Sequence, residues 1–127
     1  MMKDIQSRDD LEKIISLFYQ KLIQDESMYP FFEEIVAEKT LASHLSIIVD
    51  FWEDILFQTY KYRNNPMKKH LDFHKKMKFS KEHFQRWLSY LNDSIDSDFQ
   101  GPISDRMKAR AISIAMVMQT KMNLYTS

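Results

Sequence analysis

The sequence predicts an all-α protein that forms a single domain over residues 1–127. Apolar residues recur at steps of three and four along most of the chain, which is the spacing of one buried helix face. The chain has one glycine and three prolines, whereas an all-β fold needs many turns built from these residues. A hydrophobic content of 44% is enough for one core, and 127 residues leave no room for a second domain.

The first expected helix begins after Ser7, which forms an approximate capping box with Asp10 three residues later. Its inward face extends over residues 11–23 at helical spacing. A break at residues 25–30 follows, and the apolar pattern of residues 31–36 then predicts a short helix.

The second long helix is expected over residues 41–56, the most apolar stretch of the chain. Asparagine tolerates left-handed backbone and proline disfavours helix in the residue before it, so Arg63-Asn64-Asn65-Pro66 marks the next break. Pro66 can open a second short helix that extends to about residue 73.

Two further long helices complete the predicted fold. Ser80 is a suitable N-cap for a helix whose inward residues span 84–95. Gly101 and Pro102 separate it from a last helix with inward residues from 107 to 122. Four long and two short helices are therefore expected around one core.

Composition excludes several classes of function. The absence of cysteine excludes disulfides, thiolate ligands and a cysteine nucleophile, and a single glycine excludes the glycine-rich loops that bind phosphate. The beginning of the chain is charged and no apolar run is long enough to span a membrane, so we expect a cytoplasmic protein that binds no membrane.

Basic residues are concentrated between Lys61 and Lys81, where eight lysines and arginines accompany one acid, Asp72. The net charge of the whole chain is zero, which does not favour nucleic-acid binding. The segment is either a solvated surface or a contact for an acidic partner. A helical binding module that uses this segment without any cofactor remains an alternative reading.

Three side chains with polar tips fall on apolar helix faces: Tyr19, His44 and Trp87. Each alone is most simply a buried residue with a satisfied hydrogen bond. Because they lie on three helices of one core, their donors could also converge on a buried ligand. With His70 on the opposite side, such a core could hold a planar cofactor with an open coordination position. Its apolar walls would be Phe18, Phe32, Ile48, Phe51 and Leu88.

Other chemistries have weaker support. His70 and His74 at i, i+4 could bind a metal, but no second pair of ligands lies on another apolar face. A di-iron bundle needs paired Glu-x-x-His motifs and none is present. No Ser, His and acid stand out as a hydrolytic set.

Several segments carry a resemblance to a known family: Phe18-Tyr19-x-Lys21-Leu22, Pro30-Phe31-Phe32, His44-Leu45, Asp50-Phe51-Trp52, Asn65-Pro66-Met67-x-x-His70, His83-Phe84-x-x-Trp87 and Arg110-Ala111. Their order and spacing resemble those of the group III truncated haemoglobins over nearly the whole chain. The resemblance implies a truncated globin fold, a two-over-two helical sandwich that encloses haem b and its iron.

The same resemblance implies roles for individual residues. His70 matches the histidine that binds the iron, with His74 as its competitor. Tyr19, His44, Trp87 and Ile48 match the residues on the side where a ligand binds, and Phe32 matches a phenylalanine that packs on the haem. No catalytic residue is implied.

The implied ligands are O₂, CO and NO, and the implied reactions are NO removal or peroxide chemistry. Turnover would need an electron-donor protein, for which the basic segment Lys61–Lys81 is a candidate docking surface. A globin that binds or senses its ligand without turnover is the alternative, so the sequence leaves open whether the protein is an enzyme.

Overall fold

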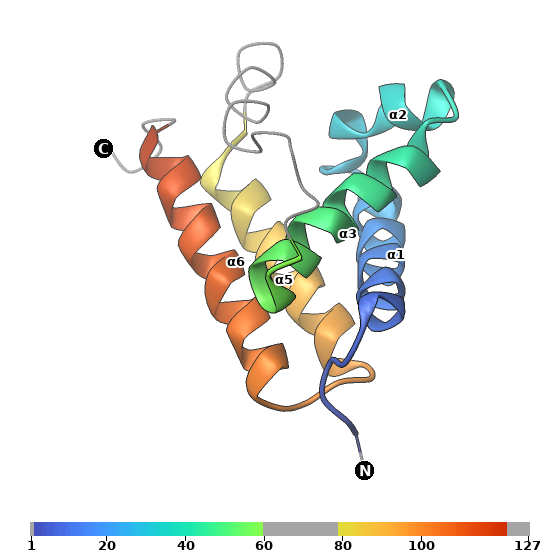
Figure 1. Ribbon diagram of the computed structural model, residues 1–127. Coiled ribbons are helices and arrows are strands. Elements are labelled where there is room, and N and C mark those ends of the chain that lie inside the picture. Colours follow the sequence, from blue (N-terminus) through green and yellow to red (C-terminus); the bar gives the residue numbers. More distant parts are fainter. Residues whose placement is uncertain (1, 60–78, 122–127) are drawn as a thin grey trace.

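A computed structural model describes residues 2–59 and 79–121 of the chain, and the regular structure in these residues is helical (Figure 1). The elements are α1 (Arg8–Gln24), the 3₁₀ helix η1 (Tyr29–Phe31), α2 (Glu33–Ala37), α3 (Leu41–Phe57), α5 (Lys81–Asp96) and α6 (Pro102–Lys121). The predicted all-α fold and its four long helices are confirmed. The short helix expected over 31–36 is divided into η1 and α2, and the one expected after Pro66 lies outside the described residues.

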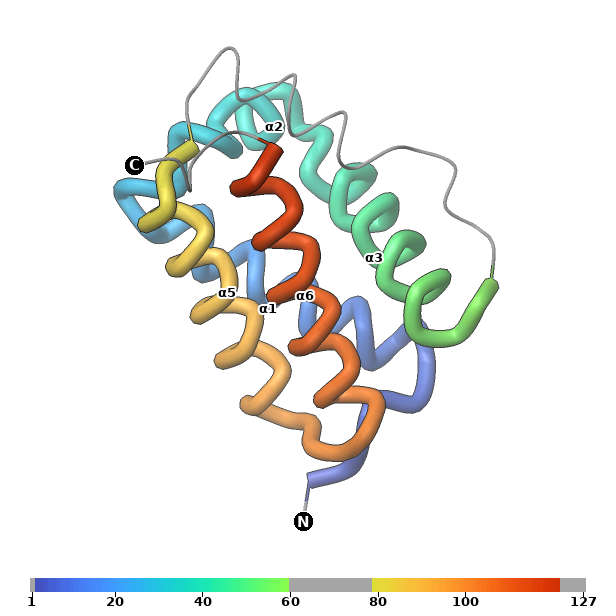
Figure 2. Tube along the Cα trace, turned by 90° about the vertical axis from the view of Figure 1, so that its left-hand side faces the viewer, coloured from blue at the N-terminus to red at the C-terminus, as the bar shows by residue number. Residues whose placement is uncertain are grey.

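The four long helices form two layers of two. α1 packs against both α3 and α5, and α6 packs against α5 and, less extensively, against α3. Figure 2 shows α5 and α6 side by side, with α3 on the other side of α6 in that view. With α1 and α3 as one pair and α5 and α6 as the other, α1 is the helix that joins the two pairs.

The core follows the predicted faces closely. The α1 residues that are buried at three- and four-residue steps are Leu11, Ile14, Ile15, Phe18, Tyr19 and Leu22. They meet Leu91 and Ile95 from α5, and Met107 and Ala111 from α6, in one continuous cluster. Within the described residues, no helix is both long and apolar enough to cross a membrane.

The two predicted N-caps have different outcomes. Ser80 caps α5 as expected, because its side chain accepts from the His83 N–H while the His83 imidazole accepts from the Ser80 N–H. Ser7 does stand at the N-cap of α1, but its side chain makes no capping bond. Instead the buried carboxylate of Asp10 accepts the backbone N–H of Gln6 at 2.8 Å. The expected capping box therefore does not form.

The beginning of α6 is held by a residue from the other end of the chain. The carboxylate of Asp4 accepts the backbone N–H groups of Ile103 and Ser104, each at 2.8 Å. The carboxylate approaches so closely that a Cβ on Gly101 would lie 2.6 Å from the Asp4 side chain. Gly101 also has φ +150°, a backbone conformation that side chains disfavour, so this position requires glycine.

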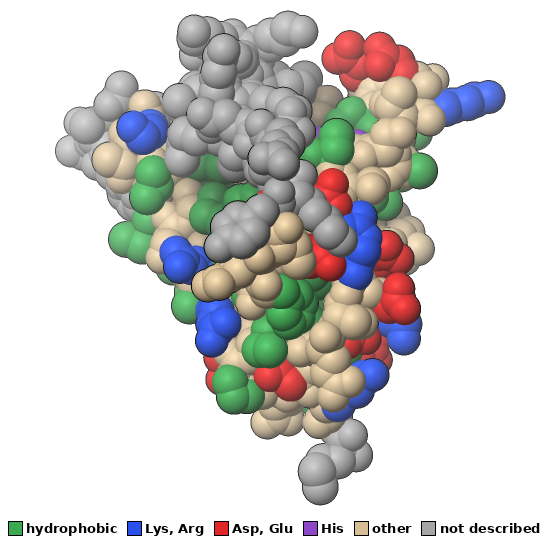
Figure 3. All heavy atoms as spheres, viewed as in Figure 1, with side chains coloured by type: hydrophobic (Ala, Val, Ile, Leu, Met, Phe, Trp, Pro, Cys, Tyr) green, Lys and Arg blue, Asp and Glu red, His purple; other side chains and the backbone are tan. Residues whose placement is uncertain are grey.

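Ion pairs close the outer edge of α1 and α3, where Figure 3 shows acidic and basic side chains intermingled. The Arg8 guanidinium lies 2.6 Å from Asp50 and 3.0 Å from Glu53, which is 8% exposed. Burial of Glu53 requires such a partner.

Candidate functional site

The polar centre of the core is a contact between Tyr19 on α1 and His44 on α3. Tyr19 is 7% exposed, and its hydroxyl lies 2.9 Å from Nε2 of the half-buried His44. The two rings meet edge to face with centroids 5.4 Å apart. Two of the three polar-tipped residues predicted to converge are therefore in direct contact.

Aromatic rings surround this pair. Phe18 and Phe32 meet the Tyr19 ring edge to face, at centroid distances of 5.5 and 5.3 Å. Trp87 on α5 joins the cluster through Phe18, whose ring centre is 5.9 Å away. The third predicted donor thus reaches the same cluster through an intervening phenylalanine.

Tyr19 keeps its proton in this setting, because burial raises the pKa of its hydroxyl far above the physiological range. A phenol carries one proton, so at any moment Tyr19 either donates to His44 or has that proton available for another acceptor. The Trp87 indole N–H is a donor only. The cluster therefore suits a small ligand that accepts hydrogen bonds.

Apolar surface extends from this centre along α3. One face of α3 is buried in the core through Val49, Trp52 and Leu56. A second set of apolar residues on α3 packs against the core but stays half-buried: Leu41, Leu45, Ile48, Phe51 and Ile55. Leu88 on α5 is half-buried in the same way. Such surface beside buried polar donors fits a flat apolar group with a polar reactive centre, as haem is.

The described residues contain no cluster of side chains that could hold a metal ion by themselves. Among residues 2–59 and 79–121, no group of three or more histidines and acids is placed to hold a metal ion. His70 and His74, the predicted iron ligand and its competitor, lie outside the described residues. So does most of the basic segment, of which the structure describes residues 79–81 only.

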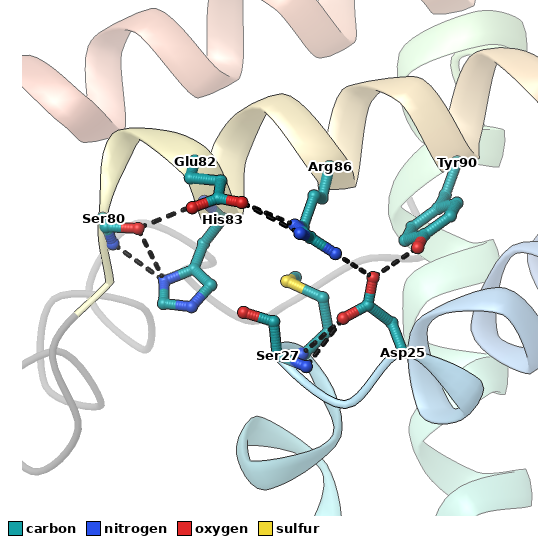
Figure 4. A network of polar contacts seen from close by, with 8 residues as sticks. Asp25, Ser27, Ser80, Glu82, His83, Arg86 and Tyr90 are labelled. Carbon is teal, nitrogen blue, oxygen red and sulfur yellow. Dashed lines mark hydrogen bonds and ion pairs between the residues drawn. The ribbon is translucent and has the colours of Figure 1, made fainter.

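A second polar network, which sequence reasoning missed, lies at the C-terminal end of α1 (Figure 4). The carboxylate of Asp25 accepts from Arg86 at 2.6 Å and from Tyr90, both on α5. It also accepts the backbone N–H groups of Ser27 and Met28 at 2.7 and 3.1 Å. In the sequence, Asp25 is one acid in a polar break between helices, and no pattern around it indicates these partners.

Burial opposes ionisation of Asp25, but hydrogen bonds from Tyr90, Arg86 and the two backbone N–H groups outweigh it, and its pKa falls to about 2. The hydrogen bonds that Arg86 donates to Glu82, and next to Asp25, raise the pKa of Arg86. Both groups are therefore charged at every physiological pH. A surface depression of about 540 Å³ beside them is lined by Asp25, Glu26, Ser27 and Arg86, and it contains none of the predicted site residues.

Comparison with known proteins finds a similar sequence and a similar structure. No family model matches the chain. A curated protein of Campylobacter jejuni, described as a group 3 truncated haemoglobin, is 26% identical over 121 residues, which cover 94% of this chain and 93% of that protein. A crystal structure of a group III truncated haemoglobin from the same species superposes with a TM-score of 0.86, over 99% of this chain and 97% of that one.

The chain is similar in sequence and in fold to the group III truncated haemoglobins. The two layers of this chain form the two-over-two sandwich that the sequence predicted, with α1 and α3 as one pair and α5 and α6 as the other. The Tyr19–His44 contact spans the first pair, and Trp87 comes from the second.

Proposed function

We propose that this protein is a truncated haemoglobin, which binds haem and holds a diatomic ligand, O₂, CO or NO, beside Tyr19 and His44. The observation that carries the proposal is the part-buried hydrogen bond of 2.9 Å between these two side chains, which lies next to half-buried apolar surface. The relatives' description as haemoglobins supports the same reading.

The proposed cofactor is haem b. We assign the iron to Nε2 of His70, with His74 as the competing ligand. Haem supplies, when bound, an iron with one coordination position open to a diatomic ligand. Phe18, Phe32, Phe51 and Leu88 are proposed as its apolar pocket, and Ile48 as an apolar contact on the ligand side.

The residues on the ligand side act as hydrogen-bond donors. The Tyr19 hydroxyl can turn its proton from His44 to the ligand, and the Trp87 indole N–H can donate from α5. Tyr19 is buried with Phe18 and Phe32 packed against its ring, and low access to water strengthens any bond that its hydroxyl makes. Each such bond is worth about 1–3 kcal/mol, or roughly a five- to a hundredfold slower release of the ligand.

Slow release suits reaction of the ligand better than its transport. We therefore extend the proposal to NO removal or peroxide chemistry in the cytoplasm, with an electron-donor protein that docks on the basic segment Lys61–Lys81. Ligand binding without turnover is the second candidate. The two differ in whether the oxidised protein is re-reduced fast enough for repeated turnover with NO or peroxide.

The test is an absorption spectrum of the purified protein with haem, oxidised, then reduced with dithionite, then with CO. We expect a strong Soret band that shifts with CO. The His70→Ala variant should lose the normal spectrum, and an unaltered one would assign the iron to His74. Tyr19→Phe and Trp87→Phe should each speed release of O₂. Failure of the folded protein to take up stoichiometric haem would overturn the proposal.

A further inference from the structure

We infer that Asp25 is a positioning residue, which fixes Trp87 and Phe32 relative to Tyr19 and so sets the direction of the donors on the ligand side. The inference rests on the proposed function for the role of those donors. It concerns a residue outside the ligand pocket, in a network with no direct part in ligand binding.

Asp25 stands at the junction of three segments. It is the C-cap of α1, six residues after Tyr19, and it begins the loop that leads to η1. Its side chain is 4% exposed. A buried carboxylate needs a full set of donors, and each donor that it recruits is held in place by it.

The two carboxylate oxygens serve different elements. Oδ2 accepts from Arg86 and Tyr90, which are one turn apart on α5. Oδ1 accepts from the backbone N–H groups of Ser27 and Met28 in the loop. One side chain therefore ties α5 and the loop to the end of α1.

The α5 side of this tie bears directly on Trp87, because Arg86 is its neighbour and Tyr90 lies three residues further along. Arg86 is also held by Glu82 at 2.9 Å, so its guanidinium is fixed from both sides. Trp87 in turn packs against Phe18 on α1. Loss of the Asp25 contacts leaves the indole held by its packing against Phe18 and against the core clusters alone.

The loop side bears on Phe32. The Met28 N–H is bound to Asp25, the Met28 side chain is 3% exposed, and the chain continues through η1 to Phe32. The Phe32 ring then meets Tyr19 at 5.3 Å. Asp25 thus fixes both ends of the aromatic cluster that surrounds the Tyr19 hydroxyl.

An asparagine in place of Asp25 cannot replace these contacts. Its amide has one oxygen to accept with, and its NH₂ group would face either the α5 donors or the loop N–H groups. The Asp25→Asn variant therefore keeps the shape of the side chain but releases one of the two elements. Asp4→Asn is the matched control, because Asp4 also accepts several backbone N–H groups but lies at the opposite end of the fold, at the start of α6.

The experiment uses the haem-loaded protein and two readouts. The first is the ¹⁵N–¹H signal of the Trp87 indole, assigned with Trp87→Phe and separated from that of Trp52. The second is the infrared stretching band of carbon monoxide used as the probe ligand, which responds to nearby hydrogen-bond donors. For Asp25→Asn we expect the Trp87 signal to shift, the Trp52 signal to stay, and the carbon monoxide band to move to higher wavenumber or to split. Asp4→Asn should leave both readouts as in the wild type.

Unchanged readouts in Asp25→Asn would overturn the inference, and so would equal changes in Asp25→Asn and Asp4→Asn, which indicate general loosening. If Asp25→Asn does not fold, Tyr90→Phe removes one donor and keeps the carboxylate, and the same shifts are expected in smaller size. A carbon monoxide band that is unmoved in both Tyr19→Phe and Trp87→Phe contradicts the proposed function instead. In that case the Trp87 indole signal alone tests the positioning role: a shift in Asp25→Asn supports it, and an unchanged signal contradicts it.

Discussion

Replacement of His44 by leucine tests how the one proton of Tyr19 is shared. A phenol is the better donor and a neutral imidazole nitrogen the better acceptor, so in the 2.9 Å contact we expect Tyr19 to donate to Nε2 of His44. When a ligand arrives on that side, Tyr19 has to give up this bond to donate to the ligand. Removal of the competing acceptor should therefore make the bond to the ligand more favourable.

The size of the effect follows from the contact that is lost. A hydrogen bond between neutral groups contributes about 0.5–1.5 kcal/mol net. In the wild type, Tyr19 loses this contribution when it turns from His44 to the ligand. In His44→Leu there is no such bond to lose, so O₂ should dissociate about 2- to 12-fold more slowly. Leucine keeps much of the side-chain volume at this half-buried position of α3.

The dissociation rate is measured by stopped-flow mixing of the oxygenated protein with CO and dithionite. The association rate of O₂ is measured as well. If His44 only restricts ligand entry, its loss raises both rates by the same factor and leaves the equilibrium constant unchanged. In the Tyr19→Phe background, His44→Leu should have no effect on dissociation. Dissociation that is equally fast or faster in His44→Leu than in the wild type would refute the reasoning.

Three further predictions concern stability. The pKa of Asp25 falls from 3.8 to about 2 on folding, which corresponds to about 1–2 kcal/mol after allowance for screening at its exposed arginine partner. Because the folded pKa is the lower one, urea unfolding should show this advantage over Asp25→Asn in full above pH 5, and it should shrink as the pH falls from 4 to 2. Gly101→Ala should cost about 1–3 kcal/mol and lower Tm, because of its φ of +150° and the nearby Asp4 side chain; an unchanged Tm would contradict this account. Arg8→Met should cost about 1–3 kcal/mol in the same unfolding assay, because it removes the guanidinium that lies 3.0 Å from the buried Glu53, and an equal loss in Glu53→Gln/Arg8→Met would argue against that cause.

The sequence predicted those parts of the site that depend on helix periodicity. The steps of three and four place Tyr19 on the inward face of α1 and His44 on an apolar face of α3, and the structure brings the two side chains together. Trp87 joins the same aromatic cluster through its ring contact with Phe18, and the convergence of the three donors on a ligand stays a prediction.

The parts that could not be predicted depend on contacts between distant segments. Asp25 finds its α5 partners 61 and 65 residues further along the chain, and nothing in its own neighbourhood indicates them. At Ser7, the local capping pattern was overridden because the carboxylate of Asp10 bonded to the Gln6 N–H instead.

On α6, apolar residues occur on several faces of the helix, and the steps of three and four still select the buried face. Met107, Ala111, Ala115 and Met118 are buried as predicted, whereas Ile112, Met116 and Val117, which fall outside that pattern, are 44–53% exposed.

The place of α1 at the junction of both helix pairs has a consequence for synthesis on the ribosome. The apolar face of α1 emerges before the helices that cover it, α3 and α5, which extend to residues 57 and 96. A nascent chain that stops before residue 80 has no α5 to complete this core. Such chains should be sensitive to protease and should engage chaperones, and protection should arise abruptly once α5 has left the exit tunnel.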